Sequence, residues 1–324
     1  MHDPQLLPAH PEPAPLPASL EATAAQAREY VEASKAVNTR RAYRSDWRAF
    51  SAWCERHGRE SLPASAETVA LYLASAAESL KPATLQRRLA SISQAHQVAG
   101  HETPTRSAPV RTVWQGIVRT HGVAPAQKSP LLVPALLALV GTCARDPQGV
   151  RDRALLLVGF GGAFRRSELV GLDVSDLAFG ADGVTVTVRR SKTDQEGAGR
   201  LVGIPRGAQP ESCPVRALRA WVQCAGLKEG ALFRGVNRHG TVLPGRLTAQ
   251  AVALVVKRRA AAAGLAPEQF AGHSLRAGLA TSAAAAGASE RSIMAQTGHR
   301  SERVARRYIR AGSLFRENAA AGLL

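Results

Sequence analysis

The stretch "DGVTVTVRRSKTDQEGAGRLVGIP", residues 182–205, decides the expected fold because it contains the one clear β-hairpin pattern in the sequence. Val184, Val186 and Val188 alternate with threonines, and a second apolar run follows a glycine-rich turn. An apolar residue at every second position is typical of a strand buried on one face. The rest of the chain is rich in alanine and leucine, which favour helices. We therefore predict a mainly α fold in which one domain is mixed α/β, mostly helical with a small antiparallel sheet.

The sequence before this hairpin has a helical pattern. In "NTRRAYRSDWRAFSAWCERHG", Tyr43, Trp47, Phe50 and Cys54 recur at spacings of three and four, and Gly58 ends the run. "SAETVALYLASAAES", "KPATLQRRLASISQAHQVAG" and "RTVWQGIVRTHG" predict three more helices. Together they predict a small helical bundle with basic residues on its outer faces.

Helices are also predicted on both sides of the hairpin. "PALLALVGTCA" and "RDRALLLVGFGGAFRRSELVGL" precede it and have the apolar composition of buried helices. From "CPVRALRAWVQCAG" onward the sequence returns to a helical pattern, and we expect no further strand there.

Proline and glycine mark the expected domain boundaries. Residues 1–19 are proline-rich without periodicity and predict a disordered tail. Residues 20–120 form the helical bundle, residues 121–131 are the expected linker, and residues 132–324 form the second domain.

Charge and cysteine content restrict the class of protein. The formal net charge of +17 over 324 residues indicates a polyanionic partner, although a generally arginine-rich proteome would also produce it. The four cysteines form no C-x-x-C pair, so we expect reduced thiols in a cytoplasmic protein without a metal site. No window is apolar enough for a membrane span.

Several polar side chains recur at places where chemistry is possible. "GGAFRRSEL" contains Arg165 and, three residues later, Glu168; "HSLR" is expected to begin a helix. The candidate catalytic residues are Arg165, Lys192 near the hairpin tip, His273, Arg276, His299 and Tyr308. Each of these residue types alone is more often a surface, salt-bridge or core residue. Only the six residues together, in this order along the chain, indicate a catalytic site.

This ordered set resembles the tyrosine recombinase family, also called the phage integrase family. The resemblance is carried by "GAFRRSEL", the hairpin lysine, "HSLR", "TGHRS" and "RYIR", and it covers roughly residues 20–320. Phe164 and Arg166 depart from residues common in the family but only flank Arg165. The resemblance implies a SAM-like core-binding domain at residues 20–120, a catalytic domain at 132–324, and no arm-binding domain.

The candidate residues also suggest a reaction. Arg165 and Arg276 offer planar forks to the oxygens of a phosphodiester and stabilise the charge of its transition state. Tyr308 is the expected nucleophile, since nearby cations favour loss of its proton. His273 is the expected general base.

The remaining residues complete the expected site. Lys192 is the expected general acid for the leaving 5′-oxygen, and His299 donates a hydrogen bond to the phosphate. By resemblance, Glu168 orients the cluster of Arg165 and His273. The product is a 3′-phosphotyrosine, which a second 5′-hydroxyl attacks on the way to a Holliday junction. No cofactor is expected, because the sequence contains neither a Walker loop nor an acidic cluster for two metal ions.

DNA contacts are expected from both domains. The candidates are Thr39, Arg40, Arg41, Tyr43, Arg44, Thr84, Gln86, Arg87, Arg88, Ser91, Arg246, Thr248, Gln250, Lys257 and Arg258. The expected partner is double-stranded DNA with a short core site. By resemblance the protein forms a dimer on each site and a tetramer in the synapse, and it can need an accessory directionality factor. The apolar segment 311–324 docks either on its own subunit or on a neighbour.

Two other functions remain open from the sequence. A type IB topoisomerase shares the catalytic constellation but lets one duplex swivel without exchange. A DNA-binding regulator descended from a recombinase would lack a catalytic residue, whereas all six are present here. The sequence does not distinguish integration, excision or resolution, or a phage, transposon, plasmid or chromosome as the host element.

Overall fold

The computed structural model describes residues 18–33, 35–122, 128–189, 199–299 and 301–312. The chain divides into two compact units, Met1–Ala126 and Gln127–Leu324, and each is described by itself. The expected tail lies outside the described residues except for its last two residues, which begin a helix.

The first unit is helical. Its elements are α1 (Ala18–Ala33), α2 (Val37–Arg56), α3 (Ala66–Ala77), α4 (Pro82–Val98), a 3₁₀ turn (Pro104–Arg106) and α5 (Ala108–His121). The predicted helices in this part of the chain are confirmed. Ser65 caps α3 by accepting the backbone N–H of Thr68. Pro82 begins α4, where its missing N–H costs no helical hydrogen bond.

The core of the first unit comes from one face of each helix from α2 to α5. Phe50, Tyr72, Leu85 and Ile92 are at most 2% exposed. Phe50 and Tyr72 meet edge to face with centroids 5.0 Å apart. The helical spacing of the apolar residues therefore produces the bundle.

The second unit mixes helices with two small sheets. Its elements are α6 (Val133–Gly141), α7 (Pro147–Gly161), α8 (Arg166–Gly171), β1 (Leu177–Phe179), β2 (Gly183–Val188), β3 (Arg200–Pro205), α9 (Pro214–Cys224), β4 (Arg234–Val236), β5 (Val242–Arg246), α10 (Ala249–Ala262), α11 (Ser274–Ala285), α12 (Glu290–Thr297) and α13 (Glu302–Gly312). Short 3₁₀ turns lie at Val174–Asp176, Pro210–Ser212 and Pro267–Gln269. The mainly helical fold class with a small antiparallel sheet is confirmed.

The predicted hairpin is present and belongs to a three-stranded antiparallel sheet ordered β1–β2–β3. Val184 pairs with Ile204 and Val186 with Val202, and all four side chains are at most 2% exposed. The alternation in the sequence thus sets both the register and the buried face.

The expectation that the chain is helical from residue 213 onward is wrong in one place. β4 and β5 form a second antiparallel hairpin, with Arg234 opposite Arg246 and Val236 opposite Val242. The two strands are short and their residues are at least partly exposed, so no apolar alternation marks them in the sequence.

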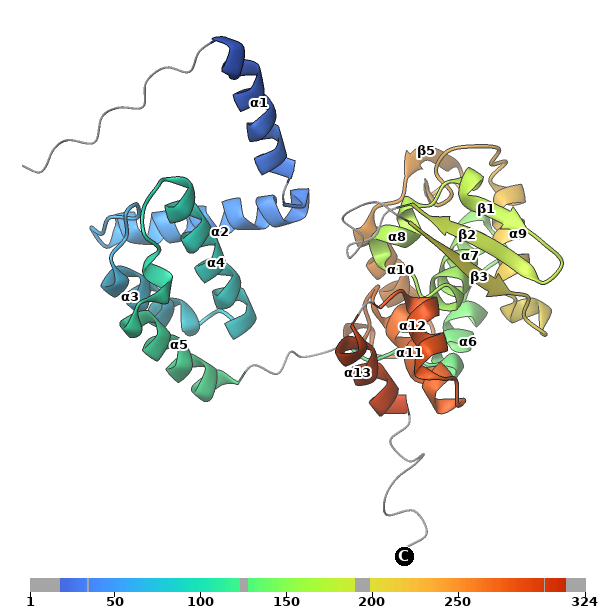
Figure 1. The fold of residues 1–324 in the computed structure, drawn as a ribbon. Helices are drawn as coiled ribbons and strands as arrows, with labels where there is room; N and C mark the ends of the chain where they lie inside the picture. The colour runs from blue at the N-terminus through green and yellow to red at the C-terminus, as the bar shows by residue number, and fades with distance from the viewer. Residues whose placement is uncertain (1–17, 34, 123–127, 190–198, 300, 313–324) are drawn as a thin grey trace, which may run out of the picture. The chain divides into compact units, whose positions relative to one another are not determined.

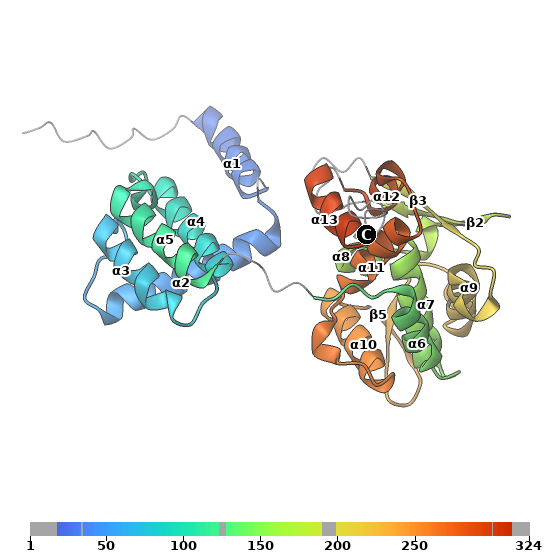
Figure 2. The ribbon, with the colours of Figure 1, turned by 90° about the horizontal axis from the view of Figure 1, so that it is seen from below.

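α7 runs through the core of the second unit. Ala154, Leu155, Leu156 and Val158 are fully buried on it. α11 packs against α7 and against the segment before α6, where a Cβ on Gly278 would lie 2.0 Å from the carbonyl oxygen of Leu131. α11, α12 and α13 lie together in both views (Figures 1 and 2).

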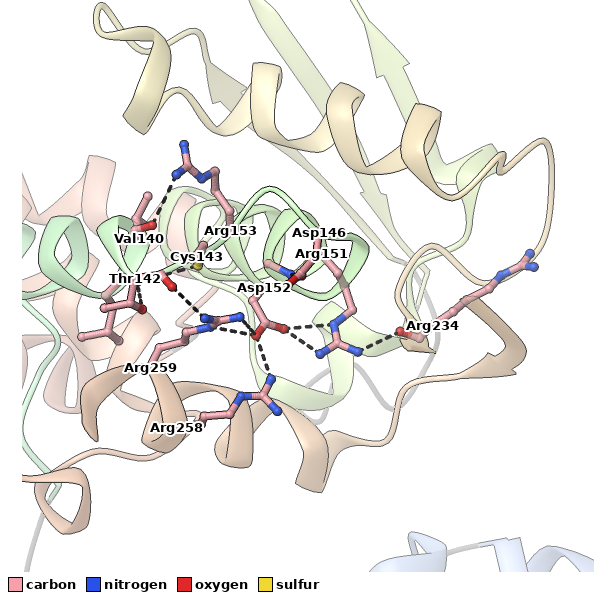
Figure 3. A network of polar contacts seen from close by, with 12 residues as sticks. Val140, Thr142, Cys143, Asp146, Arg151, Asp152, Arg153, Arg234, Arg258 and Arg259 are labelled. Carbon is pink, nitrogen blue, oxygen red and sulfur yellow. Dashed lines mark hydrogen bonds and ion pairs between the residues drawn. The ribbon is translucent and has the colours of Figure 1, made fainter. Parts of the chain in front are cut away.

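A buried polar network joins α7 to α10 (Figure 3). The carboxylate of Asp152, which is 0% exposed, accepts hydrogen bonds from Arg151 at 2.6 Å, Arg258 at 2.7 Å and Arg259 at 2.9 Å. Arg259 also donates to the carbonyl of Thr142. A single carboxylate therefore holds three guanidinium groups between the two helices.

Candidate active site

The first candidate residue, Arg165, precedes α8 as its N-cap. Glu168 accepts the backbone N–H of Arg165 at 3.0 Å and its Nη1 at 2.5 Å, so the carboxylate caps the first turn of α8 from its third residue. Burial works against ionisation of Glu168, but the hydrogen bonds and charge of Arg165 outweigh it and lower the pKa of Glu168. Glu168 thus fixes both the backbone and the side chain of Arg165.

The turn between α7 and α8 contains a backbone position of high energy. Ala163 has a backbone φ of +48°, a value that residues other than glycine rarely adopt. Its carbonyl accepts a hydrogen bond from Nη1 of Arg276 at 2.9 Å. The turn therefore connects the first candidate arginine to the second.

Arg276 is a buried cation with unused donors. Its side chain lies on α11 and is 1% exposed, and among the described residues Nε and Nη2 have no acceptor. Burial and the charge of Arg165 lower the pKa of Arg276 to about 10. Buried donors of this kind are normally satisfied, so the site is suited to an anion that brings its own oxygens.

His273 and Tyr308 are in direct contact. His273 is the N-cap of α11, as expected from "HSLR", and its Nε2 lies 2.8 Å from the hydroxyl of Tyr308 on α13. Desolvation and the charges of Arg276, Arg165 and Arg166 lower the pKa of His273, although the residue remains accessible. The neutral ring can therefore accept the hydroxyl proton of Tyr308 at neutral pH.

His299 stacks on the ring of Tyr308. α12 ends at Gly298 in the left-handed conformation, with φ +65°, and this turn directs the chain to His299. The rings of His299 and Tyr308 stack with centroids 5.8 Å apart and an interplanar angle of 16°. Burial and the charges of Arg276 and Arg165 lower the pKa of His299 to about 4.

Arg200 is a member of this cluster that the sequence did not reveal. It begins β3, donates to Glu168 at 3.3 Å, and donates to the carbonyl of Gln296 on α12 at 3.1 Å. A Cβ on Gly298 would lie 2.8 Å from its Nε, so the glycine allows the close approach. Only the folded chain brings these residues together, since 96 positions separate Arg200 from Gln296.

Five of the six predicted catalytic residues therefore lie at one site, on α8, α11, α12 and α13 or at their ends: Arg165, His273, Arg276, His299 and Tyr308. The sixth, Lys192, lies outside the described residues.

In the first unit, the structure brings the two segments of candidate DNA contacts side by side. Asp46, which is 4% exposed, accepts two hydrogen bonds from Arg87, at 2.6 and 3.0 Å. Ser91 donates to the carbonyl of Tyr43 at 2.8 Å. α2 and α4 thus pack against each other, and buried Asp46 orients the side chain of Arg87.

One of the candidate DNA contacts does not fit that role, and a second also makes hydrogen bonds inside its own unit. Ser91 is 3% exposed and uses its hydroxyl inside the bundle. Arg246 donates from Nη1 to the carbonyls of Val170 and Leu172, at 2.7 and 2.9 Å, and from Nη2 to Asp173. Arg246 therefore stabilises the end of α8, but 39% of its side chain is exposed and it stays a predicted DNA contact. We correct the expectation for Ser91 alone.

The other candidates are at least partly exposed. Thr39, Arg41, Arg44, Gln86, Thr248, Gln250, Lys257 and Arg258 are exposed, and Arg40, Tyr43, Thr84 and Arg88 are half-buried. Thr248 also caps α10 by accepting the N–H of Ala251. Arg88 donates to the hydroxyl of Tyr72.

In the described part of the chain, no three His, Cys, Asp or Glu side chains lie close enough to hold a metal ion. None of the described helices has the length and apolarity to cross a membrane.

In a comparison with known proteins, both units match models of one protein family. Residues 133–313 match the phage integrase family, and residues 28–103 match the SAM-like N-terminal domain of phage integrases. The chain is 42% identical over 298 residues to an integrase/recombinase xerD homolog of Selenomonas ruminantium, covering 91% of this chain and 87% of that protein. It is 28% identical over 293 residues to the tyrosine recombinase XerC of Syntrophus aciditrophicus, covering 86% and 88%.

Solved structures share the fold at low sequence identity. A lambda integrase dimer bound to a COC′ core site matches with a TM-score of 0.61 at 17% identity, covering 90% of this chain and 77% of that one. The integrase of the transposon Tn1549 in complex with transposon right-end DNA matches with a TM-score of 0.62 at 17% identity, covering 88% and 92%.

Proposed function

Since the chain belongs to the phage integrase family and is a tyrosine site-specific recombinase that cleaves and rejoins DNA, we propose that Tyr308 is its nucleophile. The observation that carries the proposal is the 2.8 Å contact between the Tyr308 hydroxyl and Nε2 of His273. A neutral imidazole there accepts the proton as the phenol oxygen attacks phosphorus.

The phosphate is held by arginines. Arg276 brings the unused donors of Nε and Nη2, and Arg165 is fixed beside it by Glu168. Both guanidinium groups bind non-bridging oxygens and stabilise the charge that increases in the pentavalent transition state. Burial strengthens this interaction because little water screens it.

In the cleavage step, the bonds formed and broken and the protons transferred balance. A bond forms between the Tyr308 oxygen and phosphorus, the bond from phosphorus to the 5′-oxygen breaks, and His273 takes the phenol proton. We assign to Lys192 the donation of a proton to the leaving 5′-oxygen. The 3′-phosphotyrosine retains the energy of the diester, so a 5′-hydroxyl of a second duplex can reverse the reaction without ATP or metal.

Exchange of strands on two duplexes follows from the same chemistry applied twice, through a Holliday junction. We propose that the protein binds a short core site as a dimer and forms a tetramer in the synapse. The dimer of lambda integrase on a core site supports the first part. In this scheme residues 20–120 bind the core site, residues 132–324 catalyse, and residues 311–324, most of which lie outside the described residues, contact a subunit.

The test is a suicide substrate. Nicked duplexes made from the DNA that flanks the gene are incubated with wild type and with Tyr308→Phe, and covalent complexes are measured by denaturing electrophoresis. We expect a complex from wild type only, while Tyr308→Phe still binds, because the substitution removes one hydroxyl. Equal amounts of covalent complex from both proteins would refute Tyr308 as the nucleophile.

The same preparations separate the topoisomerase alternative. A recombinase joins strands from two differently labelled duplexes, whereas a swivelase relaxes supercoiled plasmid without exchange. Relaxation of the plasmid with no exchanged product would refute the proposed tetrameric synapse and the exchange of strands between two duplexes.

A further inference from the structure

Thr297, which no part of the proposed mechanism uses, is in direct contact with a catalytic histidine. It is the last residue of α12 and is 0% exposed. Its hydroxyl oxygen lies 2.7 Å from the carbonyl oxygen of Ile293 and 2.8 Å from Nδ1 of His299.

The proton on each atom follows from these two contacts. A carbonyl oxygen can only accept, so the single hydroxyl proton of Thr297 points to Ile293. The oxygen of Thr297 therefore faces Nδ1 of His299 with a lone pair, and Nδ1 must carry a proton. A neutral imidazole has one N–H, so Nε2 of His299 carries a lone pair in the free protein.

This tautomer is the wrong one for binding a phosphate. A lone pair on Nε2 repels a phosphate oxygen. The role expected for His299 from the sequence, a hydrogen bond donated to the phosphate, needs a donor at Nε2, because Nδ1 faces Thr297. Resting on the proposed function, we propose that Thr297 is a positioning residue that fixes His299 in the Nδ1–H tautomer, so that the ring must bind a proton as the DNA phosphate enters.

The surroundings of His299 agree with an uptake of this kind. The titratable and charged groups that face the ring are Arg276 and His273 from α11 and its cap, Arg165 from the start of α8, Arg200 from β3 and Tyr308 from α13. Removal from water and the charges of the arginines disfavour the imidazolium and lower the pKa of His299 to about 4. A phosphate anion between these cations reverses the balance.

The sign of the pH dependence follows. The free ring is neutral at pH 7 and the ring in the complex is protonated, so the productive complex weakens as pH rises. For one proton the decline is at most about tenfold per pH unit. If Thr297 did not fix the tautomer, a neutral ring could donate from Nε2 and this decline would be absent.

The first experiment determines the tautomer directly. The full-length protein is labelled with ¹⁵N at histidine, and two-bond ¹⁵N–¹H correlations distinguish Nδ1–H from Nε2–H rings; the spectrum of His299→Gln assigns the signal. We expect Nδ1–H in wild type and in Thr297→Ser, which keeps the hydroxyl. Thr297→Val removes the acceptor at nearly constant volume and should shift the ring to Nε2–H. An Nε2–H ring in wild type would overturn the proposal.

The second experiment follows covalent complex formation on the nicked substrate from pH 6 to pH 9. We expect the alkaline decline in wild type and Thr297→Ser, and its loss in Thr297→Val and in His299→Gln, whose amide donates at any pH. A Thr297→Val protein that is slower at every pH with an unchanged profile would show a merely structural role and refute the proposal. If wild type forms no covalent complex although its His299 is Nδ1–H, the proposed function itself has failed, and the catalytic part of this inference fails with it.

Discussion

At the scale of single residues, the site has the features of an anion-binding site. Among the described residues, two nitrogens of buried Arg276 have no hydrogen-bond partner, and burial together with the charges of Arg165 and Arg200 disfavours its ionised form. The backbone at Ala163 has a high-energy conformation, and its carbonyl accepts a hydrogen bond from Arg276. Such costs are tolerated where the arrangement binds a transition state better than it stabilises the fold.

We therefore expect Arg276→Met to have opposite effects on stability and on activity. Removal of a poorly paired buried cation should raise the Tm of the protein, by about 2 °C or more. The same change should lower the rate of covalent complex formation by about 10²-fold or more, since a transition-state contact is lost. Thermal unfolding followed by circular dichroism and single-turnover cleavage measure the two effects.

The matched control for Arg276→Met is Arg259→Met. Arg259 is also largely buried, with 11% of its side chain exposed, but it pairs with the carboxylate of Asp152. We expect that substitution to lower the Tm. A lower Tm in Arg276→Met as well would mean that Arg276 stabilises the ligand-free fold, contrary to the argument.

The sequence predicted the residues of the site better than their contacts. The order and spacing of Arg165, His273, Arg276, His299 and Tyr308 pointed to one reaction, and the structure brings all five together. The bonds of Arg200 and the direction of the proton on His299 depend on distances between separate elements, which no local pattern encodes. The pairing of Arg246 with α8 was unpredictable for the same reason.

At the scale of elements, strongly periodic segments were predictable and short ones were not. The β2–β3 hairpin and α2 to α5 follow from alternation, helical spacing, caps and terminal glycines. β4 and β5 are short and have no apolar alternation of their own, so the sequence led us to expect helix in their place. Elements that carry the site, by contrast, are fixed at their ends by polar contacts such as the hydrogen bond from the Arg165 N–H to Glu168.

The Asp152 network gives a prediction at this scale. Asp152→Ala leaves Arg151, 5% exposed, and Arg259, 11% exposed, as buried cations without a carboxylate. We expect a loss of about 3–5 kcal/mol in the free energy of unfolding, because one partner of a buried ion cluster is removed. Denaturant titration of the second unit measures the loss.

Arg258→Ala is the comparison for Asp152→Ala. The side chain of Arg258 is 48% exposed, so water screens its pairing and its loss should cost about 1 kcal/mol or less. Equal losses in the two variants would contradict the view that α7 and α10 are joined through the buried part of the network.

At the scale of the whole molecule, charge and fold point to the same substrate. The net charge of +17 supplies long-range attraction to DNA. The apolar cores of the two units carry no charge and contribute nothing to this attraction. Lysine and arginine contacts with phosphate release counterions, so binding must depend steeply on salt. The candidate contacts on α2 and α4 lie side by side, as the Asp46–Arg87 pair requires.

We therefore predict that exposed Arg44 contributes one phosphate contact. In Arg44→Gln, the slope of log Kobs against log salt concentration should be less steep by about 0.9 than in wild type. The measurement is fluorescence anisotropy of a random-sequence duplex with the full chain at several salt concentrations, since this electrostatic interaction does not depend on base sequence.

The matched control for Arg44→Gln is Arg56→Gln, which removes the same charge from the same helix. Arg56 is the last residue of α2, twelve positions further on, which is about 18 Å along the helix axis. That distance exceeds the Debye length of about 8 Å at physiological salt, so Arg56→Gln should leave the slope close to that of wild type. If both variants reduce the slope equally, the protein binds DNA through its overall charge, and the beginning of α2 is not a contact surface.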